Sequence, residues 1–105
     1  MKPLIVHDAA EFELWQAIEY YESIRSGLGR DLIDDVQSAM IAIQESPEMW
    51  PKRKHNTRIR LLNRFPFGVY YLELPEAIWI IAYAHLKRRP YYWHSRFRKV
   101  KKQDY

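Results

Sequence analysis

The spacing of apolar residues changes halfway along the chain, and this change limits the folds that the sequence can adopt. Between Ala10 and Ile43, apolar residues recur at intervals of three and four, which is the period of an amphipathic helix. After Thr57, short runs rich in β-branched and aromatic residues take over, as is typical of strands. A helical half followed by a strand-rich half predicts an α+β domain.

The first half is expected to form a short strand and a pair of helices. The apolar run Leu4–Val6 predicts the strand, and Asp8 with Glu11 three residues later predicts a capping box at the start of the first helix. Glycine and serine at positions 26, 27 and 29 interrupt the apolar stripe, so we expect the chain to turn there. The stripe resumes at position 28, and Pro47 predicts the end of the second helix.

The second half is expected to form three strands. Residues 47–57 are polar and basic and predict a loop, after which charged and apolar residues alternate over 58–61, the pattern of a strand with one wet face. Residues 67–74 and 78–84 predict a hairpin that turns around Pro75 and Glu76. The expected order is a strand, a two-helix hairpin and then three strands, giving a mostly antiparallel sheet with the helices packed on one face.

Composition restricts the partners and the compartment. The 105 residues include no cysteine, so the fold stands on packing without disulfides or thiolate metal ligands. The first 50 residues carry a net charge of −7 and the rest +11, which predicts that one face meets an anionic partner. The amino terminus lacks the pattern of a signal peptide and the apolar runs are too short to cross a bilayer, so we expect a soluble, cytoplasmic protein with no membrane partner.

A basic and aromatic stretch follows the last expected strand. It runs from His85 to Lys102 as HLKRRPYYWHSRFRKVKK, with no acid before Asp104. Such a mixture suits a polyanion whose bases can be stacked on, and it suits an acidic protein equally well. Alternatively, the aromatic residues Tyr91, Tyr92 and Trp93 form a clasp that folds the stretch back onto the sheet, since their burial would stabilise a small domain.

Three segments in their order along the chain resemble the RelE/ParE superfamily of toxins from bacterial type II toxin-antitoxin systems. They are the GLG turn at Gly27–Gly29, the RFPFGVYY block at Arg64–Tyr71 and the AHLKRRPYYW segment at Ala84–Trp93. The resemblance extends from about Leu4 to about Phe97. It implies a single RelE/ParE-like toxin domain over residues 1–98, followed by a basic tail over 99–105 that we expect to be mobile.

The resemblance also implies partners and a target. The partner would be a small cognate antitoxin that masks the basic surface, in a system of the kind that stabilises plasmids by inhibiting growth. The target would be DNA gyrase, as for ParE-like and plasmid-stabilisation proteins, or messenger RNA on the ribosome, as for RelE-like endoribonucleases. Both targets stay open at the level of the sequence.

A ribonuclease here would work without a metal, because no cluster of carboxylates and histidines has ligand spacing. No cofactor is expected either. Metal-free cleavage needs a base, cations beside the phosphate and an acid. His85 is the candidate base, Arg64 and Arg88 would hold phosphate, and Tyr92 would stack on a base or donate a proton. The arrangement resembles RelE-type sites in location and residue type. In the alternative, His85 caps the strand and Arg64 is an ordinary turn residue.

Further cations are candidates for contact with nucleic acid or another target. Arg58 and Arg60 share one face of their strand, and a basic loop precedes them. The candidate binding residues are Lys52, Lys54, Arg58, Arg60, Arg89 and Arg96. The alternative is a solvated strand face and loop.

Overall fold

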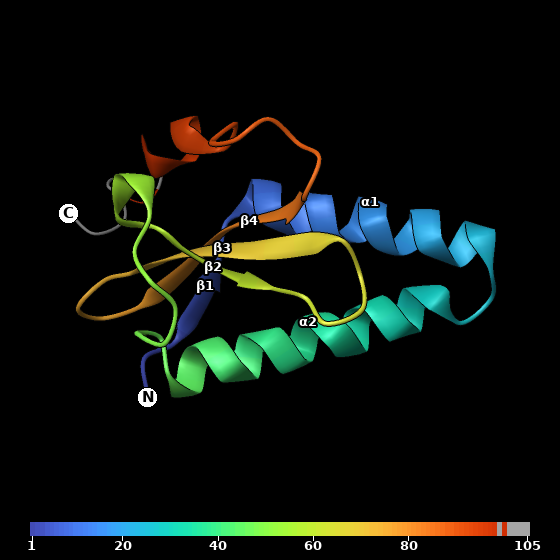
Figure 1. The fold of residues 1–105 in the computed structure, drawn as a ribbon, viewed down its shortest axis with the longest axis horizontal. Coiled ribbons are helices and arrows are strands. Elements are labelled where there is room, and N and C mark those ends of the chain that lie inside the picture. The colour runs from blue at the N-terminus through green and yellow to red at the C-terminus, as the bar shows by residue number, and fades with distance from the viewer. Residues whose placement is uncertain (99, 101–105) are drawn as a thin grey trace.

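The computed structural model describes residues 1–98 and residue 100 and forms two layers, a four-stranded sheet and a helical hairpin (Figure 1). In chain order the elements are β1 (Leu4–Val6), α1 (Asp8–Ile24), α2 (Leu28–Glu45), the 3₁₀ turn η1 (Lys54–Asn56), β2 (Arg58–Leu61), β3 (Phe67–Glu73), β4 (Ile78–His85) and the 3₁₀ turn η2 (His94–Arg96). The strand order is β1-β4-β3-β2, with β1 parallel to β4 and the other pairs antiparallel. The expected α+β fold is confirmed.

The start of α1 differs from the expected capping box. The N-cap is His7, whose Nδ1 accepts a hydrogen bond of 3.0 Å from the backbone N–H of Ala9. Asp8 and Glu11 lie in the first turn, where negative charge is favourable because backbone N–H groups point outward there. The two carboxylates therefore support the helix start, but the prediction that Asp8 caps it was wrong.

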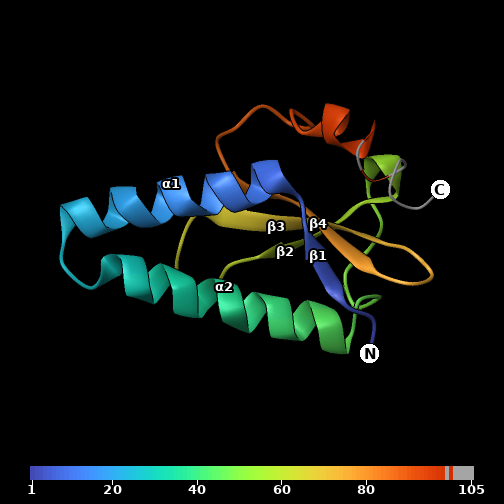
Figure 2. The ribbon, with the colours of Figure 1, turned by 180° about the vertical axis from the view of Figure 1, so that it is seen from behind.

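The turn between the helices depends on glycine at two positions for different reasons. Gly27 is the N-cap of α2 and has φ of 94°, a left-handed conformation that glycine adopts without strain. Gly29 lies inside α2, where an added Cβ would come within 3.1 Å of the Ile18 carbonyl oxygen. The Glu22 carboxylate accepts hydrogen bonds from both glycine N–H groups. The helices can therefore approach closely at a turn that projects beyond the sheet (Figure 2).

One face of the sheet packs against the helices and forms the main core. Buried side chains from α2 meet the inward residues of β3 and β4, among them Val69, Tyr71 and Ile80. The Tyr71 hydroxyl donates a hydrogen bond of 2.6 Å to the Pro47 carbonyl, so the segment after α2 is tied to the sheet. Asp35 is also buried, at 7% exposure.

A β-bulge in β4 changes which side chains face the helices. Tyr70 pairs with Ala82 whereas Tyr71 pairs with Ile80, so Ile81 is an extra residue on β4. Before the bulge Ile80 faces the helices, and after it Tyr83 does. Every residue of β4 before His85 is buried, which explains why the sequence there is a continuous apolar run.

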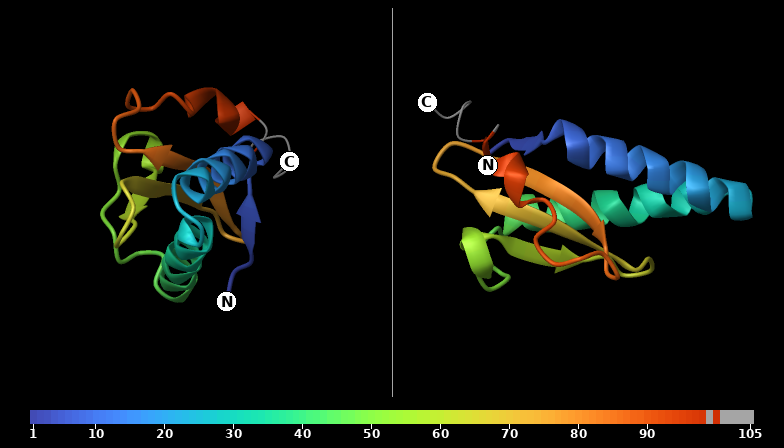
Figure 3. Two further views of the ribbon diagram at one scale, coloured as in Figure 1. Left: turned by 90° about the vertical axis from the view of Figure 1, so that its right-hand side faces the viewer. Right: turned by 90° about the horizontal axis from the view of Figure 1, so that it is seen from above.

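The second face of the sheet is covered by the chain after β4, which returns across it on the side away from α2 (Figures 1 and 3). Trp93 is fully buried in a second core with Trp79, Ala82 and Val100, and Tyr91 and Tyr92 pack against it. The expectation of an aromatic clasp is confirmed. The expected tail over 99–105 lies, apart from Val100, outside the described residues. Over the described ranges, no helix is long and apolar enough to cross a membrane.

Candidate functional site

A groove of about 490 Å³ runs between α1 and the open end of the β3–β4 hairpin, where β3 begins and β4 ends. The α1 wall carries Glu13, Ala17, Tyr20 and Ile24, and the opposite wall includes Phe67, Tyr83, His85 and Arg88. Two of the four residues predicted to catalyse RNA cleavage, His85 and Arg88, therefore line this groove, and they also line a smaller adjoining pocket together with the third, Tyr92. The surface of the groove is more apolar than polar, and its polar groups come from Glu13, Gln16, His85, Arg88 and the tyrosine hydroxyls.

His85 is the last residue of β4 and is half-buried. Its Nδ1 accepts a hydrogen bond of 3.1 Å from the backbone N–H of Lys87, and its ring meets the Phe67 ring edge-on at 5.2 Å between centroids. Because Nδ1 is an acceptor, the proton of the neutral ring lies on Nε2. The hydrogen bond from Lys87 agrees with the alternative in which His85 caps the end of β4. Because His85 also lines the groove, a ligand bound there could still contact it.

Arg88 lies on the face of Tyr92, with the guanidinium carbon 3.8 Å from the ring centroid. The Tyr92 hydroxyl in turn donates a hydrogen bond to the Glu13 carboxylate. Burial, together with that hydrogen bond and the negative charge of Glu13, raises the pKa of Tyr92 above its ordinary value. Tyr92 therefore keeps its proton and serves as a fixed platform beneath Arg88.

Glu13 is the organising residue of this region. Its carboxylate also accepts two hydrogen bonds from Arg96, of 2.8 and 3.0 Å, and one of 3.2 Å from the Tyr83 N–H. Arg96 additionally donates to the carbonyl of the bulge residue Ile81. The side chains of the pair are only 12% and 15% exposed. The pair satisfies the Tyr83 N–H and the Ile81 carbonyl, two backbone groups of β4 that lie past the end of its pairing with β1. It also fastens the segment that follows β4 to α1.

Arg64 lies outside the groove lining, in the loop between β2 and β3. Its guanidinium is 3.5 Å from the Asp31 carboxylate, and its backbone N–H donates a hydrogen bond of 2.8 Å to Asp35. Asp35 also accepts from the N–H groups of Asn63 and Phe65. The position of Arg64 is thus fixed by two aspartates of α2. These contacts favour the alternative interpretation, in which Arg64 is an ordinary turn residue.

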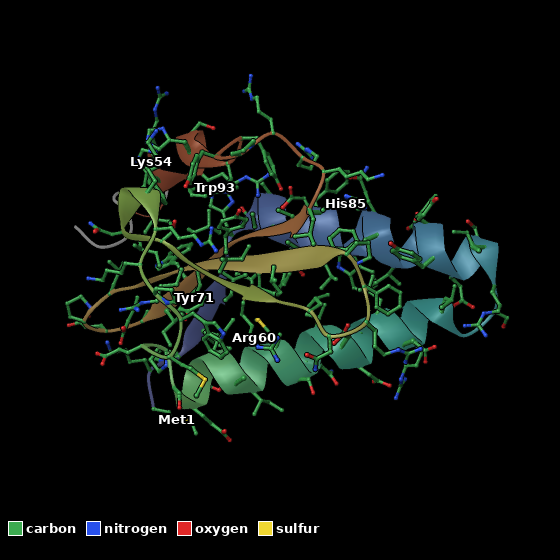
Figure 4. All side chains as sticks on the ribbon, viewed as in Figure 1. Met1, Lys54, Arg60, Tyr71, His85 and Trp93 are labelled. Atoms are coloured by element: carbon green, nitrogen blue, oxygen red, sulfur yellow. The ribbon has the colours of Figure 1, made fainter. Side chains whose placement is uncertain are left out.

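Arg58 and Arg60 point toward the segment that follows α2 rather than into the groove. Arg58 donates hydrogen bonds to the carbonyls of Glu48 and Trp50, and the Arg60 guanidinium lies 5.4 Å from the Trp50 ring centroid. Figure 4 shows Arg60 between the sheet and α2, far from His85. These contacts fasten the loop to β2.

The remaining predicted cations are exposed. Lys52 and Lys54 lie in the loop before β2, and Arg89 lies after β4. The Lys54 ammonium is 5.5 Å from the Tyr91 ring centroid, and Figure 4 shows Lys54 close to Trp93. Lys54 therefore borders the segment that follows β4, at the end of the sheet away from His85.

Two histidines that are distant in sequence meet beside these lysines. The rings of His55 and His94 lie 4.2 Å apart between centroids, and the His55 ring also contacts Tyr91. Partial burial, together with His94 and Lys54, lowers the pKa of His55 below its ordinary value. His55 also has a φ of 63°. No group of three His, Asp or Glu side chains within residues 1–98 and 100 is placed to hold a metal ion.

Sequence reasoning missed Glu13 as a site residue. It lies three residues after Ala10 and four before Ala17, so the helical period already places it beside the buried stripe. Its partner Arg96 is 83 positions away. The inward position of an acid on α1 was therefore a usable signal, whereas the identity of its partner was not.

Fold and site together define a small α+β protein whose candidate site is a binding groove between α1 and the β3–β4 hairpin. The chain matches a chain of a solved structure described as "Chromosomal ParDE TA system from P. aeruginosa", with a TM-score of 0.62 and 16% sequence identity over 81% of this chain and 96% of that one. The expected RelE/ParE-like fold is thereby confirmed. No family model matches the chain. A search of curated proteins also gives no match.

Proposed function

We propose that this chain is the toxin of a bacterial type II toxin-antitoxin system and that a small antitoxin neutralises it. The proposal is supported by the fold, which extends over most of both chains in the comparison with the ParDE system. It is also supported by the exposed cations Lys52, Lys54, Arg88 and Arg89, which suit an acidic antitoxin. Such a protein would act in the cytoplasm, where it would inhibit growth and stabilise a plasmid that carries the pair.

The toxin is proposed to act by binding DNA gyrase, in the manner of ParE-like proteins. The observation that carries this choice is that two of the four ribonuclease candidates, Arg64 and Tyr92, have their functional groups engaged by acidic side chains. Arg64 is held by Asp31 and Asp35, and the Tyr92 hydroxyl is held by Glu13 with a raised pKa. A phosphate that reaches His85 and Arg88 would find Arg89 in the adjoining pocket, but the Tyr92 hydroxyl there already donates its proton to Glu13.

The alternative is a RelE-like, metal-independent endoribonuclease acting on the ribosome. One observation favours it: His85 and Arg88 both line the groove, which leaves a candidate base beside one phosphate-binding cation. In that case Arg89 would be the second cation, and the acid would have to come from the ribosome-bound RNA complex.

Two expression experiments test the proposal. The chain is induced alone and together with the small gene encoded beside its own; arrested growth in the first case and recovery in the second are expected. Normal growth in both would contradict a toxin. After brief induction, primer extension maps RNA cuts while gyrase-dependent DNA breaks are assayed in parallel. Breaks without RNA cuts support the gyrase mode, and cuts that disappear in His85→Ala establish the ribonuclease instead.

A further inference from the structure

The groove between α1 and the β3–β4 hairpin has one free cationic anchor. The acid in the groove lining, Glu13, is paired with Arg96, so it does not repel an incoming anion as an unpaired acid would. Within residues 1–98 and 100, no ion pair engages the Arg88 guanidinium, which lines the groove beside His85. An anionic group of a ligand would therefore bind at Arg88.

The α1 wall offers an apolar seat near this anchor. Tyr20 is 62% exposed and Ile24 is 57% exposed, which is unusual for large apolar side chains on a small domain. Tyr21 and Phe67 lie beside them in the same lining. A volume of about 490 Å³ accommodates a few side chains of a bound segment.

This mixture favours a peptide over a nucleic acid. A nucleic-acid groove tracks the phosphate chain with a row of cations, and its affinity comes mainly from those contacts. Here Arg88 is the one arginine among the described residues of the groove lining, and it faces a largely apolar wall. Arg89 lies in the adjoining pocket, and Arg64 and Arg58 are engaged elsewhere, so no row of cations from the described part of the chain follows the groove. Apolar anchors with one charged contact are instead the pattern of a groove that binds a protein segment.

The Arg88 side chain is also held in position before a ligand binds. Its guanidinium rests on the Tyr92 ring, and Glu13 holds the Tyr92 hydroxyl. A cation on an aromatic face loses less conformational freedom on binding than a solvated one. The chain from Glu13 through Tyr92 thus presents Arg88 to the groove.

We propose that this groove binds an acidic, apolar segment of a protein partner, with a carboxylate on Arg88 and an apolar side chain against Tyr20 and Ile24. The inference rests on the proposed function in so far as the toxin works through protein partners. It goes further by assigning the surface, the anchor and the chemistry of the bound segment.

The test is a selection of peptides on the purified full chain. A displayed library of random 12-residue peptides is selected, and the survivors are measured against two variants with matched controls. Arg88→Glu reverses the anchor, and Arg30→Glu reverses an exposed arginine on α2 outside the groove. Ile24→Asp places a charge in the apolar part of the groove. Its control, Ile41→Asp, makes the same substitution at a position on α2 that is 58% exposed and outside the groove.

The expected peptides carry Asp or Glu within four residues of a large apolar residue. Their affinity should fall about tenfold or more in Arg88→Glu and Ile24→Asp and stay unchanged in the controls. Circular dichroism checks that each variant is folded. No enrichment, peptides without an acid, or equal binding to Arg88→Glu would overturn the inference, and so would a 12-nucleotide RNA that displaces the peptides in an Arg88-dependent manner.

The binding test and the growth test can fail separately. A chain that arrests growth but selects no acidic peptide leaves the proposed toxin in place and removes the groove. A chain that selects such peptides but leaves growth normal keeps the groove and removes the toxin.

Discussion

Removing the Glu13 side chain should detach the segment that covers the second face of the sheet. The carboxylate accepts hydrogen bonds from Tyr92, Arg96 and the Tyr83 N–H, and both members of the ion pair are largely buried. In Glu13→Ala, the Arg96 guanidinium would keep its cost of burial without its counter-charge. Breaking a buried pair in this way costs about 3 to 5 kcal/mol, a large part of the roughly 5 to 15 kcal/mol that stabilises a domain.

Urea unfolding followed by tryptophan fluorescence measures this loss, because Trp79 and Trp93 are both buried. With a slope of about 2 kcal/mol per molar urea, the midpoint should fall by roughly 2 M. Glu19→Ala, at an exposed position of the same helix, is the control and should change stability by less than about 0.5 kcal/mol. Combining Glu13→Leu with Arg96→Met should recover much of the loss, since no charge is then left buried. A loss below about 1 kcal/mol in Glu13→Ala, or one equal to that of Glu19→Ala, would refute the reasoning.

Three further predictions concern stability. Burial raises the pKa of Tyr71 to about 12, so the folded state keeps a proton that the unfolded state releases above about pH 10. Between those pH values Tyr71 should lower the free energy of unfolding by about 1.4 kcal/mol per pH unit, and Tyr83 and Tyr92, whose pKa values are also raised by burial, should add to this slope. Tyr71→Phe should therefore reduce the slope by that amount in urea titrations at about pH 9, 10 and 11, and an unchanged slope would contradict the prediction. Gly27→Ala should lose about 1 kcal/mol because φ is 94° there, whereas Gly27→Asn should lose less; equal melting temperatures for the two variants would contradict this. Asp35→Ala leaves three loop N–H groups without their acceptor and should cost about 3 kcal/mol, with faster amide exchange at residues 63–65; unchanged exchange there would count against it.

The elements were predictable because their signals are local. The helical period, the glycines near residue 27 and Pro47 set α1 and α2 within a few residues, and the apolar runs on either side of Pro75 set the hairpin. The cap of α1 was not predictable from the same rules. A histidine and an aspartate compete for that role, and the structure gives it to His7, whose own N–H is bonded to the Ile80 carbonyl of β4.

The site was less predictable because its contacts join segments that are distant in sequence. Glu13 meets Arg96 across 83 positions, and His55 meets His94 only because the segment after β4 turns back over the sheet. The same return converts the aromatic residues of a basic stretch into a buried core. Charge counts predicted which half of the chain is cationic, but only the fold shows that Arg96 is consumed internally while Arg88 is exposed.

The proposed toxin, which would bind gyrase and be neutralised by an antitoxin, can be tested with purified components. Purified gyrase, supercoiled DNA and ATP are incubated with the purified chain, and the linear DNA released after denaturation is measured with and without the product of the adjacent small gene. We predict that linear DNA accumulates with the chain, decreases in Arg88→Glu and disappears when the antitoxin is added. Undisturbed gyrase turnover at a saturating concentration of a folded chain would contradict the account.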